Sequence, residues 1–240
     1  MEFSDPITER SLNELVSIFS WANEKREKRR TVLIGGWAVY LYNPYFGSID
    51  IDLVTSSRTR NRLTFFLRKN RGFEFRRRPL FDDRKLSLEL DRWIIDVDFG
   101  TFENEDLFEG TGVYLKLNQL KNRTSIKSVS GVDIEIPDKS MLLILKTKAA
   151  WDRSSRLNLN TSFDPDWDRS KLTKDKSDLI ALIDCEDVFD VGYLGNFFEN
   201  HDFLKQIIAD LEDSTESIKK YGKDEVQIKK TIRRFRSTIF

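Results

Sequence analysis

Two aspartates one residue apart, Asp50 and Asp52, lie in the segment Ser-Ile-Asp-Ile-Asp-Leu-Val, whose alternation is typical of a strand. Side chains two positions apart on a strand share a face, so both carboxylates lie opposite Ile51 and Leu53, which point into a core. Neighbouring carboxylates that are partly enclosed repel each other, and a divalent cation relieves this repulsion. Mg²⁺ is the usual cation of sites built from carboxylates and phosphates. The pair therefore predicts a magnesium site, or alternatively a solvated edge strand.

A two-metal phosphoryl-transfer site needs at least one more carboxylate. The segment from Trp93 to Phe99 offers two, because its apolar residues alternate with Asp96 and Asp98 in the pattern of a second strand. If the two strands are neighbours, a carboxylate of this segment converges with the Asp50 and Asp52 pair. We expect Asp96 to complete the metal and catalytic set, with Asp98 as the second candidate for that position.

Two glycines, Gly35 and Gly36, end the apolar run that precedes the Asp-x-Asp pair. A glycine has no Cβ, so its amides are exposed and its φ angle can take unusual values. A short helix is predicted over 37–42, and the N-terminus of such a helix favours anions because its amides are free and its dipole is positive there. The glycine turn is therefore predicted to contact phosphate.

A Gly-Gly turn, a helix, Ser-x-Asp-x-Asp on a strand and a later strand with aspartate together resemble the catalytic motifs of the DNA polymerase beta superfamily of nucleotidyltransferases. The resemblance implies an NTP substrate and two Mg²⁺ ions. The residues implied as metal ligands are Asp50, Asp52 and Asp96. Those implied to contact the triphosphate are Gly35, Gly36 and Ser48.

The second half of the chain carries a further pattern. An apolar helix predicted over 141–153 has Lys146 and Arg153 on one face, and after a polar loop over 154–173 a second helix carries Lys174, Asp175 and Asp178. The pattern Lys-x-x-Ala-x-x-x-Arg, a loop, then Lys-Asp-x-x-Asp resembles the abortive-infection (AbiEii-like) nucleotidyltransferases. With the catalytic motifs, this resemblance spans about 31–185.

The AbiEii-like resemblance implies roles for these five residues. Lys146 and Arg153 would contact the triphosphate, and Lys174 and Asp175 would line the cleft. Asp178 would be structural or would position the base. Two alternatives stay open, namely a helix face whose long cationic side chains reach solvent and an ion pair between Asp178 and one of the cations.

Charge is balanced overall, with 40 Lys and Arg against 40 Asp and Glu, so net charge neither favours nor excludes a polyanionic partner. Local stretches are more informative. A helix predicted over 7–30 ends in the charged segment 23–30, and the most basic stretch runs from Arg68 to Arg78, partly in a strand over 73–78 that pairs with 85–91 around a turn at 81–83. Segment 23–30 is either a solvated end of the helix or a patch that binds an anionic ligand. The stretch from Arg68 to Arg78 either contacts a phosphate backbone or a triphosphate or belongs to an edge strand that its charge protects.

Some classes are excluded by composition. Cys185 is the only cysteine, so the chain has no internal disulfide and no cysteine-based zinc site. No apolar run approaches the roughly 20 residues of a membrane span, and no signal-peptide pattern is present. We therefore expect a cytoplasmic protein without a membrane partner.

The sequence thus predicts an α/β (α+β) protein with a mixed-sheet nucleotidyltransferase core over 1–137 and a C-terminal helical domain over 138–240 that closes over the nucleotide. The predicted reaction transfers an NMP from an NTP to a hydroxyl of an RNA, such as tRNA, or of a protein, and releases pyrophosphate. The resemblance also implies a toxin with a cognate antitoxin as partner. The alternatives are a non-catalytic module that binds a nucleotide or a partner on the same fold, and an antitoxin-like modifier of a cognate protein.

Overall fold

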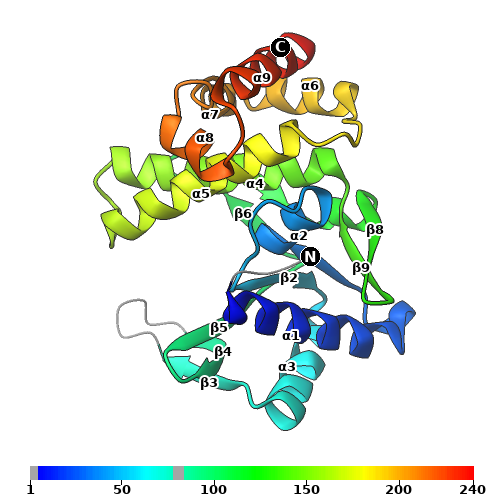
Figure 1. The fold of residues 1–240 in the computed structure, drawn as a ribbon. Coiled ribbons are helices and arrows are strands. Elements are labelled where there is room, and N and C mark those ends of the chain that lie inside the picture. Colours follow the sequence, from blue (N-terminus) through cyan, green and yellow to red (C-terminus); the bar gives the residue numbers. More distant parts are fainter. Residues whose placement is uncertain (1–4, 78–83) are drawn as a thin grey trace. The chain divides into compact units, whose positions relative to one another are not determined.

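The strand that carries Asp52 lies inside a five-stranded mixed sheet. In the computed structural model, which describes residues 5–77 and 84–240, the strand order is β1-β2-β5-β4-β3 (Figure 1). The strands are β1 (Thr31–Ile34), β2 (Ile51–Thr55), β3 (Glu74–Arg77), β4 (Arg84–Leu90) and β5 (Trp93–Thr101). β2 and β5 pair in parallel and the other neighbours are antiparallel.

The parallel pair of β2 and β5 requires a crossover connection, and α3 (Ser57–Arg71) together with the β3–β4 pair provides it. α3 begins at a Ser56 cap, whose hydroxyl accepts a hydrogen bond from the Thr59 amide at 3.2 Å, and ends at Gly72, which has a φ of 76°. Leu63 and Leu67 bury the inner side of the helix. The basic stretch therefore starts on a helix that is fixed at both ends.

α1 (Pro6–Asn23) lies beside α3, and the Trp21 and Phe66 rings stack with centroids 5.5 Å apart (Figure 1). The predicted helix over 7–30 is wrong in its last turns. Residues 24–30 contain no apolar side chain that could be buried, and they form only the short 3₁₀ helix η1 (Arg26–Lys28). Arg29 folds back and donates a hydrogen bond of 2.7 Å to the carbonyl of Trp21.

The chain divides into two units. Unit 1 comprises Met1–Leu41, Gly47–Asn104 and Lys116–Pro137, and unit 2 comprises Tyr42–Phe46, Glu105–Leu115 and Asp138–Phe240. Besides the sheet, α1 and α3, unit 1 contains α2 (Gly35–Tyr42), η2 (Leu117–Lys121) and the antiparallel pair β8 (Thr124–Val129) and β9 (Val132–Pro137).

Unit 2 is mainly helical. Its longest helices are α4 (Lys139–Asn158) and α5 (Pro165–Ile183). The shorter ones are α6 (Val191–Asn200), η3 (Asp202–Leu204), α7 (Lys205–Ala209), α8 (Thr215–Tyr221) and α9 (Glu225–Ile239), and the small pair β6 (Glu105–Leu107) and β7 (Tyr114–Lys116) precedes them. The predicted fold class, a mixed sheet followed by C-terminal helices, is confirmed.

The predicted polar loop over 154–173 is wrong, because α4 continues to Asn158 and α5 already begins at Pro165. Asp164 caps α5 by accepting a hydrogen bond of 3.0 Å from the Trp167 amide, and a proline suits the first helical position. The predicted turn at 81–83 and Arg78 lie outside the described residues. Across the described parts of the chain, no helix combines the length and the apolar character that crossing a membrane requires.

Candidate active site

Asp52 and Asp98 occupy the same level of the sheet. The parallel register of β2 and β5 pairs Ile51 with Val97 and Asp52 with Asp98. Residues that are paired on neighbouring strands point to the same face, so the two carboxylates share a face. Asp96 shares that face too, but the pairing of the two strands begins only at Val97, one residue later.

Of the two candidates for the third carboxylate, the register therefore brings Asp98 directly beside Asp52. Asp96 lies two residues earlier on β5, and Asp50 lies one residue before β2. The structure thus places all four aspartates around the start of β2 and the middle of β5, where these two strands begin to pair.

Asp96 and Asp98 each have a partner on β4. The hydroxyl of Ser87 donates to Asp96 Oδ1 at 2.6 Å, and Lys85 forms an ion pair with Asp98. The side chain of Asp98 is 38% exposed and that of Lys85 is 18% exposed. The Lys85 ammonium group therefore neutralises a carboxylate that still faces solvent.

Sequence reasoning did not single out Lys85 or Ser87. They are alternate polar residues on the predicted strand over 85–91, so the pattern assigns them to one face. Only the pairing of β4 with β5 shows that this face carries the aspartates.

Gly35 lies against the carboxylate of Asp52. A Cβ at position 35 would come within 1.9 Å of Asp52 Oδ2, and the φ of Gly35 is +72°, a value that favours glycine. β1 ends where Ile34 pairs with Asp52, and α2 begins at the next residue. The first turn of α2, with its free amides, therefore starts beside Asp52. Gly36 is buried in that turn.

Ser48 holds the chain that leads into β2. Its side chain is buried, and its hydroxyl donates a hydrogen bond of 3.1 Å to the carbonyl of Asp50. The single hydroxyl proton is thus used within the turn. The predicted phosphate contact of Ser48 stays a prediction.

The carboxylates suit Mg²⁺ in kind, since this ion takes oxygen ligands and often uses only one or two carboxylates together with substrate phosphates. In the part of the chain that the structure describes, no group of three or more acidic, histidine or cysteine side chains is arranged so that it could hold a metal ion by itself. The side chains of Asp96 and Asp98 are held by Ser87 and Lys85 instead.

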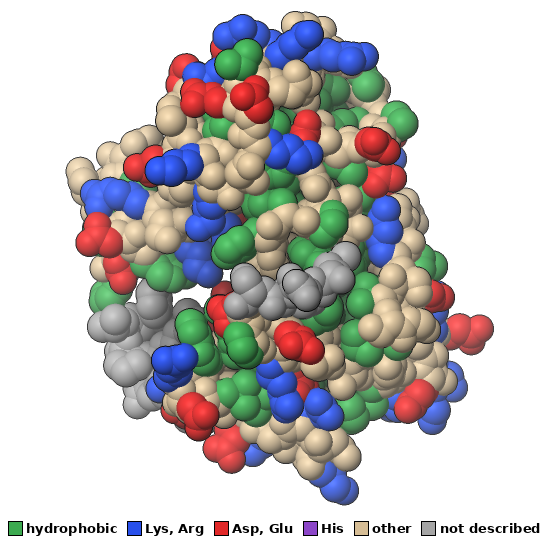
Figure 2. All heavy atoms as spheres, in the orientation of Figure 1, with side chains coloured by type: hydrophobic (Ala, Val, Ile, Leu, Met, Phe, Trp, Pro, Cys, Tyr) green, Lys and Arg blue, Asp and Glu red, His purple; other side chains and the backbone are tan. Residues whose placement is uncertain are grey.

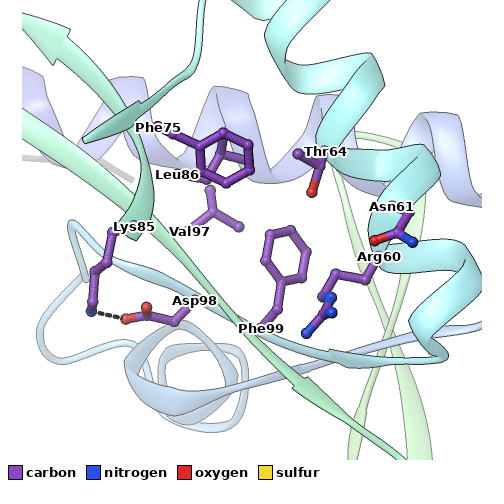
Figure 3. Close-up of a pocket in the computed structure, with 9 residues that line it drawn as sticks. All are labelled: Arg60, Asn61, Thr64, Phe75, Lys85, Leu86, Val97, Asp98 and Phe99. Atoms are coloured by element: carbon purple, nitrogen blue, oxygen red, sulfur yellow. Dashed lines mark hydrogen bonds and ion pairs between the residues drawn. The ribbon is translucent and has the colours of Figure 1, made fainter. Parts of the chain in front are cut away.

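A pocket of about 520 Å³ opens in unit 1 next to Asp98 (Figure 3). α3 contributes Arg60, Asn61 and Thr64, and the sheet contributes Phe75 and Phe99 among others. Figure 3 shows the two rings on the pocket side and the Lys85–Asp98 ion pair at its border. A volume of this size is in the range of small-molecule sites. The pocket thus lies between α3 and Asp98, the second candidate for the third metal ligand.

In unit 2, the five residues implied by the second pattern form one ion-pair network between α4 and α5. Lys146 Nζ lies 2.6 Å from Asp178 Oδ2 and 3.2 Å from Asp175 Oδ1. Arg153 also pairs with Asp175, and Lys174 Nζ lies 3.1 Å from Asp178 Oδ2. The sequence pattern had placed these residues on two helices. For Asp178, the structure shows the alternative that the sequence left open, an ion pair with Lys146.

The network is buried, and this burial, together with the neighbouring charges, shifts the pKa values of its groups. Burial opposes the charge of Asp178, but the Lys146 and Lys174 ammonium groups outweigh this effect and lower the pKa of that carboxyl. Burial lowers the pKa of Lys174, against the attraction of Asp178. Tyr45, which sequence reasoning missed, donates a hydrogen bond of 2.5 Å to Asp178, and burial and this carboxylate raise the pKa of its phenol.

Three cations, Lys146, Arg153 and Lys174, share the carboxylates of Asp175 and Asp178 in this network. Lys146 is nearly enclosed, with 8% of its side chain exposed, whereas 20% of the Arg153 side chain is exposed. Arg153 also lies near the Trp167 ring, with 5.7 Å from Cζ to the ring centroid. Arg153 is therefore better placed than Lys146 to meet an anion.

Comparison with known proteins gives distant likenesses. No protein-family model and no curated protein matches the chain. Among solved structures, the chain is similar to an antigenic nucleotidyltransferase-like protein from Paracoccidioides brasiliensis, with 15% identity over 75% of this chain and 76% of that one and a TM-score of 0.46. It is also similar to a proposed nucleotidyltransferase from Thermotoga maritima, with 15% identity over 64% of this chain and 95% of that one and a TM-score of 0.42.

Proposed function

We propose that this protein is a Mg²⁺-dependent nucleotidyltransferase that transfers an NMP from an NTP to an acceptor hydroxyl. The observation that carries the proposal is the position of Asp52, which has Asp98 beside it on a parallel strand and the backbone of Gly35 against its carboxylate. Paired carboxylates next to a bare glycine turn and a helix N-terminus suit a metal-bound triphosphate, because the amides and the dipole favour the phosphates.

The reaction forms a bond between the acceptor oxygen and the α-phosphorus of the NTP and breaks the bond from that phosphorus to the β-phosphate bridge. Pyrophosphate leaves, and the proton of the acceptor hydroxyl passes to a carboxylate or to water. Mg²⁺ held by Asp50, Asp52 and the third aspartate would neutralise charge that builds up on the phosphates. From the strand register we take Asp98 as the third aspartate, with Asp96 as the alternative.

Other groups of unit 1 would orient these carboxylates and leave space for the polyphosphate beside them. Lys85 neutralises Asp98 and orients it by their ion pair. Ser48 fixes the turn before β2 through the carbonyl of Asp50. Gly35 lets the polyphosphate approach closely, since any side chain at this position would displace Asp52. Gly36 would offer an amide from the same turn.

In unit 2, Arg153 is the residue of the buried network that we expect to contact an anion, because it is more exposed than Lys146 and lies near the Trp167 ring. Lys146, Lys174, Asp175 and Asp178 would hold α4 and α5 in place and so position Arg153. The AbiEii-like pattern further suggests a toxin whose partner is a cognate antitoxin and whose acceptor is RNA or protein.

Binding and transfer test the proposal separately. Calorimetry with each NTP and Mg²⁺ is expected to show binding that weakens when Asp52→Asn removes a charge of the site. Labelled NTPs incubated with total RNA or total protein are expected to label one of these pools, and Asp52→Asn is expected to lower the rate about 100-fold or more. The matched control is Asp91→Asn, at an exposed turn before β5.

Two outcomes would count against catalysis, and a third would show that the effect of Asp52→Asn is not specific to the site. Equal labelling by the wild type and Asp52→Asn would refute it. Tight NTP binding that needs no Mg²⁺ and gives no transfer would instead indicate a non-catalytic nucleotide-binding module. Loss of labelling in Asp91→Asn as well would point to general damage rather than to the site.

A further inference from the structure

α3 is strongly basic on its exposed side. It contains Arg58, Arg60, Arg62, Arg68, Lys69 and Arg71 and no acidic residue. Thr59, Leu63 and Leu67 face the core, so most of these cations lie on the surface. Figure 2 shows Lys and Arg side chains, in blue, over α3 at the lower edge of the molecule. Such a helix would repel itself, and a bound polyanion would relieve that repulsion.

The end of α1 and η1 extend this charge. A hollow of about 770 Å³ is lined by Lys25, Arg26 and Lys28 on one side and by Arg58 and Arg62 of α3 on the other. Two carboxylates, of Glu24 and Glu27, also line it. Positive charge therefore dominates this hollow without being the only charge there.

Few of these cations are used within the protein. Glu24 pairs with Arg29 and Glu14 pairs with Arg71. In contrast, among the residues that the structure describes, Lys25 and Lys28 form no ion pair, and neither do the three arginines in the first half of α3, Arg58, Arg60 and Arg62. These five cations are available to a ligand.

Aromatic rings lie among the same cations. A second hollow, of about 550 Å³, is lined by Trp21, Phe65 and Phe66 and shares Lys25 and Arg62 with the first. Phe65 is 65% exposed, which is unusual for a large apolar side chain. Cations that follow a phosphate backbone next to rings that stack on bases are the combination by which proteins bind single-stranded nucleic acids.

The second hollow also leads to the pocket at Asp98. Asn61 lines both, so the two are neighbours, and the Asp98 pocket adds the rings of Phe75 and Phe99. The basic surface therefore borders the pocket that Asp98 lines.

We infer that the surface formed by Lys25, Lys28, Arg58, Arg62 and Phe65, here called the α3 face, binds a single-stranded nucleic acid. Its phosphates lie on the cations and a base stacks on Phe65. The inference rests on the proposed function in one respect: the bound strand is the acceptor, and its end enters the Asp98 pocket. A duplex is disfavoured, because its stacked bases cannot reach the ring. A protein acceptor would not account for a surplus of unpaired cations.

Fluorescence anisotropy with a labelled 12-nucleotide single-stranded RNA, in EDTA and without NTP, tests binding independently of catalysis. The wild type is expected to bind with an affinity that falls as salt rises. Arg58→Gln/Arg62→Gln is expected to weaken binding and to reduce the slope of log affinity against log salt by about 1.4, since each lost phosphate contact contributes about 0.7.

The matched control is Lys230→Gln/Arg234→Gln on α9, a basic helix seen in blue at the top of Figure 2, which removes the same charge from exposed positions. This variant is expected to bind RNA as the wild type does. An equal loss in both double variants would show that net charge alone governs binding, and it would overturn the inference.

Phe65→Ala tests the stacking contact. It is expected to weaken binding of the single strand about tenfold without changing the salt slope, and circular dichroism would check that the fold is kept. No RNA binding by the wild type, no effect of Phe65→Ala, or equal affinity for a duplex of the same sequence would each overturn the inference.

The failure of the two proposals can be told apart. Asp52→Asn is expected to bind the RNA normally while losing transfer. If Asp52-dependent transfer is observed but the α3-face variants bind and use RNA normally, only the α3 face is refuted. If the α3 face binds RNA but no transfer occurs with any NTP, only the proposed function fails.

Discussion

Gly35 and Asp52 are in such close approach that a methyl group on Gly35 would lie 1.9 Å from the Asp52 carboxylate. The glycine turn and the Asp-x-Asp pair are therefore one structural feature, although fourteen residues separate Gly35 from Asp50 in the sequence. This contact connects the backbone of the turn to the residue on which the proposed chemistry depends.

Gly35→Ala is expected to destabilise the protein more than the same change at Gly131. Both glycines have positive φ angles, of +72° and +79°, but a Cβ at Gly131 would meet nothing within 4 Å. Gly131→Ala should cost about 1–2 kcal/mol from the backbone alone, and Gly35→Ala should cost more because Asp52 must move. Denaturant unfolding measures both values. Equal costs would show that the approach to Asp52 is not tight in solution.

Asp98→Asn is expected to lower the transfer rate far more than Asp96→Asn. The parallel register places Asp98 beside Asp52, whereas Asp96 lies outside the pairing and accepts a hydrogen bond from Ser87. The expected loss is about 100-fold or more for Asp98→Asn and about tenfold or less for Asp96→Asn, which alters only surrounding contacts. Single-turnover rates with labelled NTP decide this. The reverse order would make Asp96 the third carboxylate.

Arg71→Met is expected to cost about 3 kcal/mol of unfolding free energy, because it leaves a buried carboxylate without its main partner. Arg71 donates two hydrogen bonds, of 2.7 and 2.8 Å, to Glu14, whose side chain is 0% exposed. The control Arg68→Met removes an exposed cation of the same helix and should change stability by about 0.5 kcal/mol or less.

A second change separates the charge from the packing at this site. Glu14→Leu/Arg71→Met removes both charges and is expected to recover most of the lost stability. If the double variant is as unstable as Arg71→Met, the loss comes from packing between α1 and α3 and not from the unpaired carboxylate.

The buried network predicts a dependence of stability on pH. Lys146 and Lys174 outweigh burial and make the pKa of Asp178 lower in the folded protein than in the unfolded chain. The stabilisation is therefore fully present above the unfolded value of about 4 and is lost as pH falls through the lower folded value. Asp178→Asn should be less stable at neutral pH, by about 3 kcal/mol, and should lose less stability on further acidification.

Urea unfolding of the wild type and the variant between neutral and strongly acidic pH measures this difference in slope. Asp213→Asn, at an exposed position of the same unit, is the control and should keep the acid dependence of the wild type. Identical slopes for the wild type and Asp178→Asn would mean that Asp178 is not held ionised by the two lysines.

Local patterns in the sequence were sufficient for most of the elements. Alternation placed Asp52 and Asp98 on strands, because side-chain periodicity acts over a few residues. The two glycines marked the end of β1, although they are the first residues of α2 and the helix predicted over 37–42 began two residues too late. The spacing of Lys146, Arg153 and Asp178 likewise grouped them on two helices. Local patterns failed where no apolar period exists, as in residues 24–30 and 165–173.

The sequence by itself determined which residues carry charge and which face of a strand or helix they share. Only the tertiary structure decided which of these faces meet. The register that sets Asp98 rather than Asp96 beside Asp52, and Lys85 against Asp98, depends on strands that are joined by a long crossover. Similarly, the pairing of Lys146 with Asp175 and Asp178 depends on how α4 packs on α5. Such relationships follow from the burial of whole surfaces, and no short stretch of sequence contains that information.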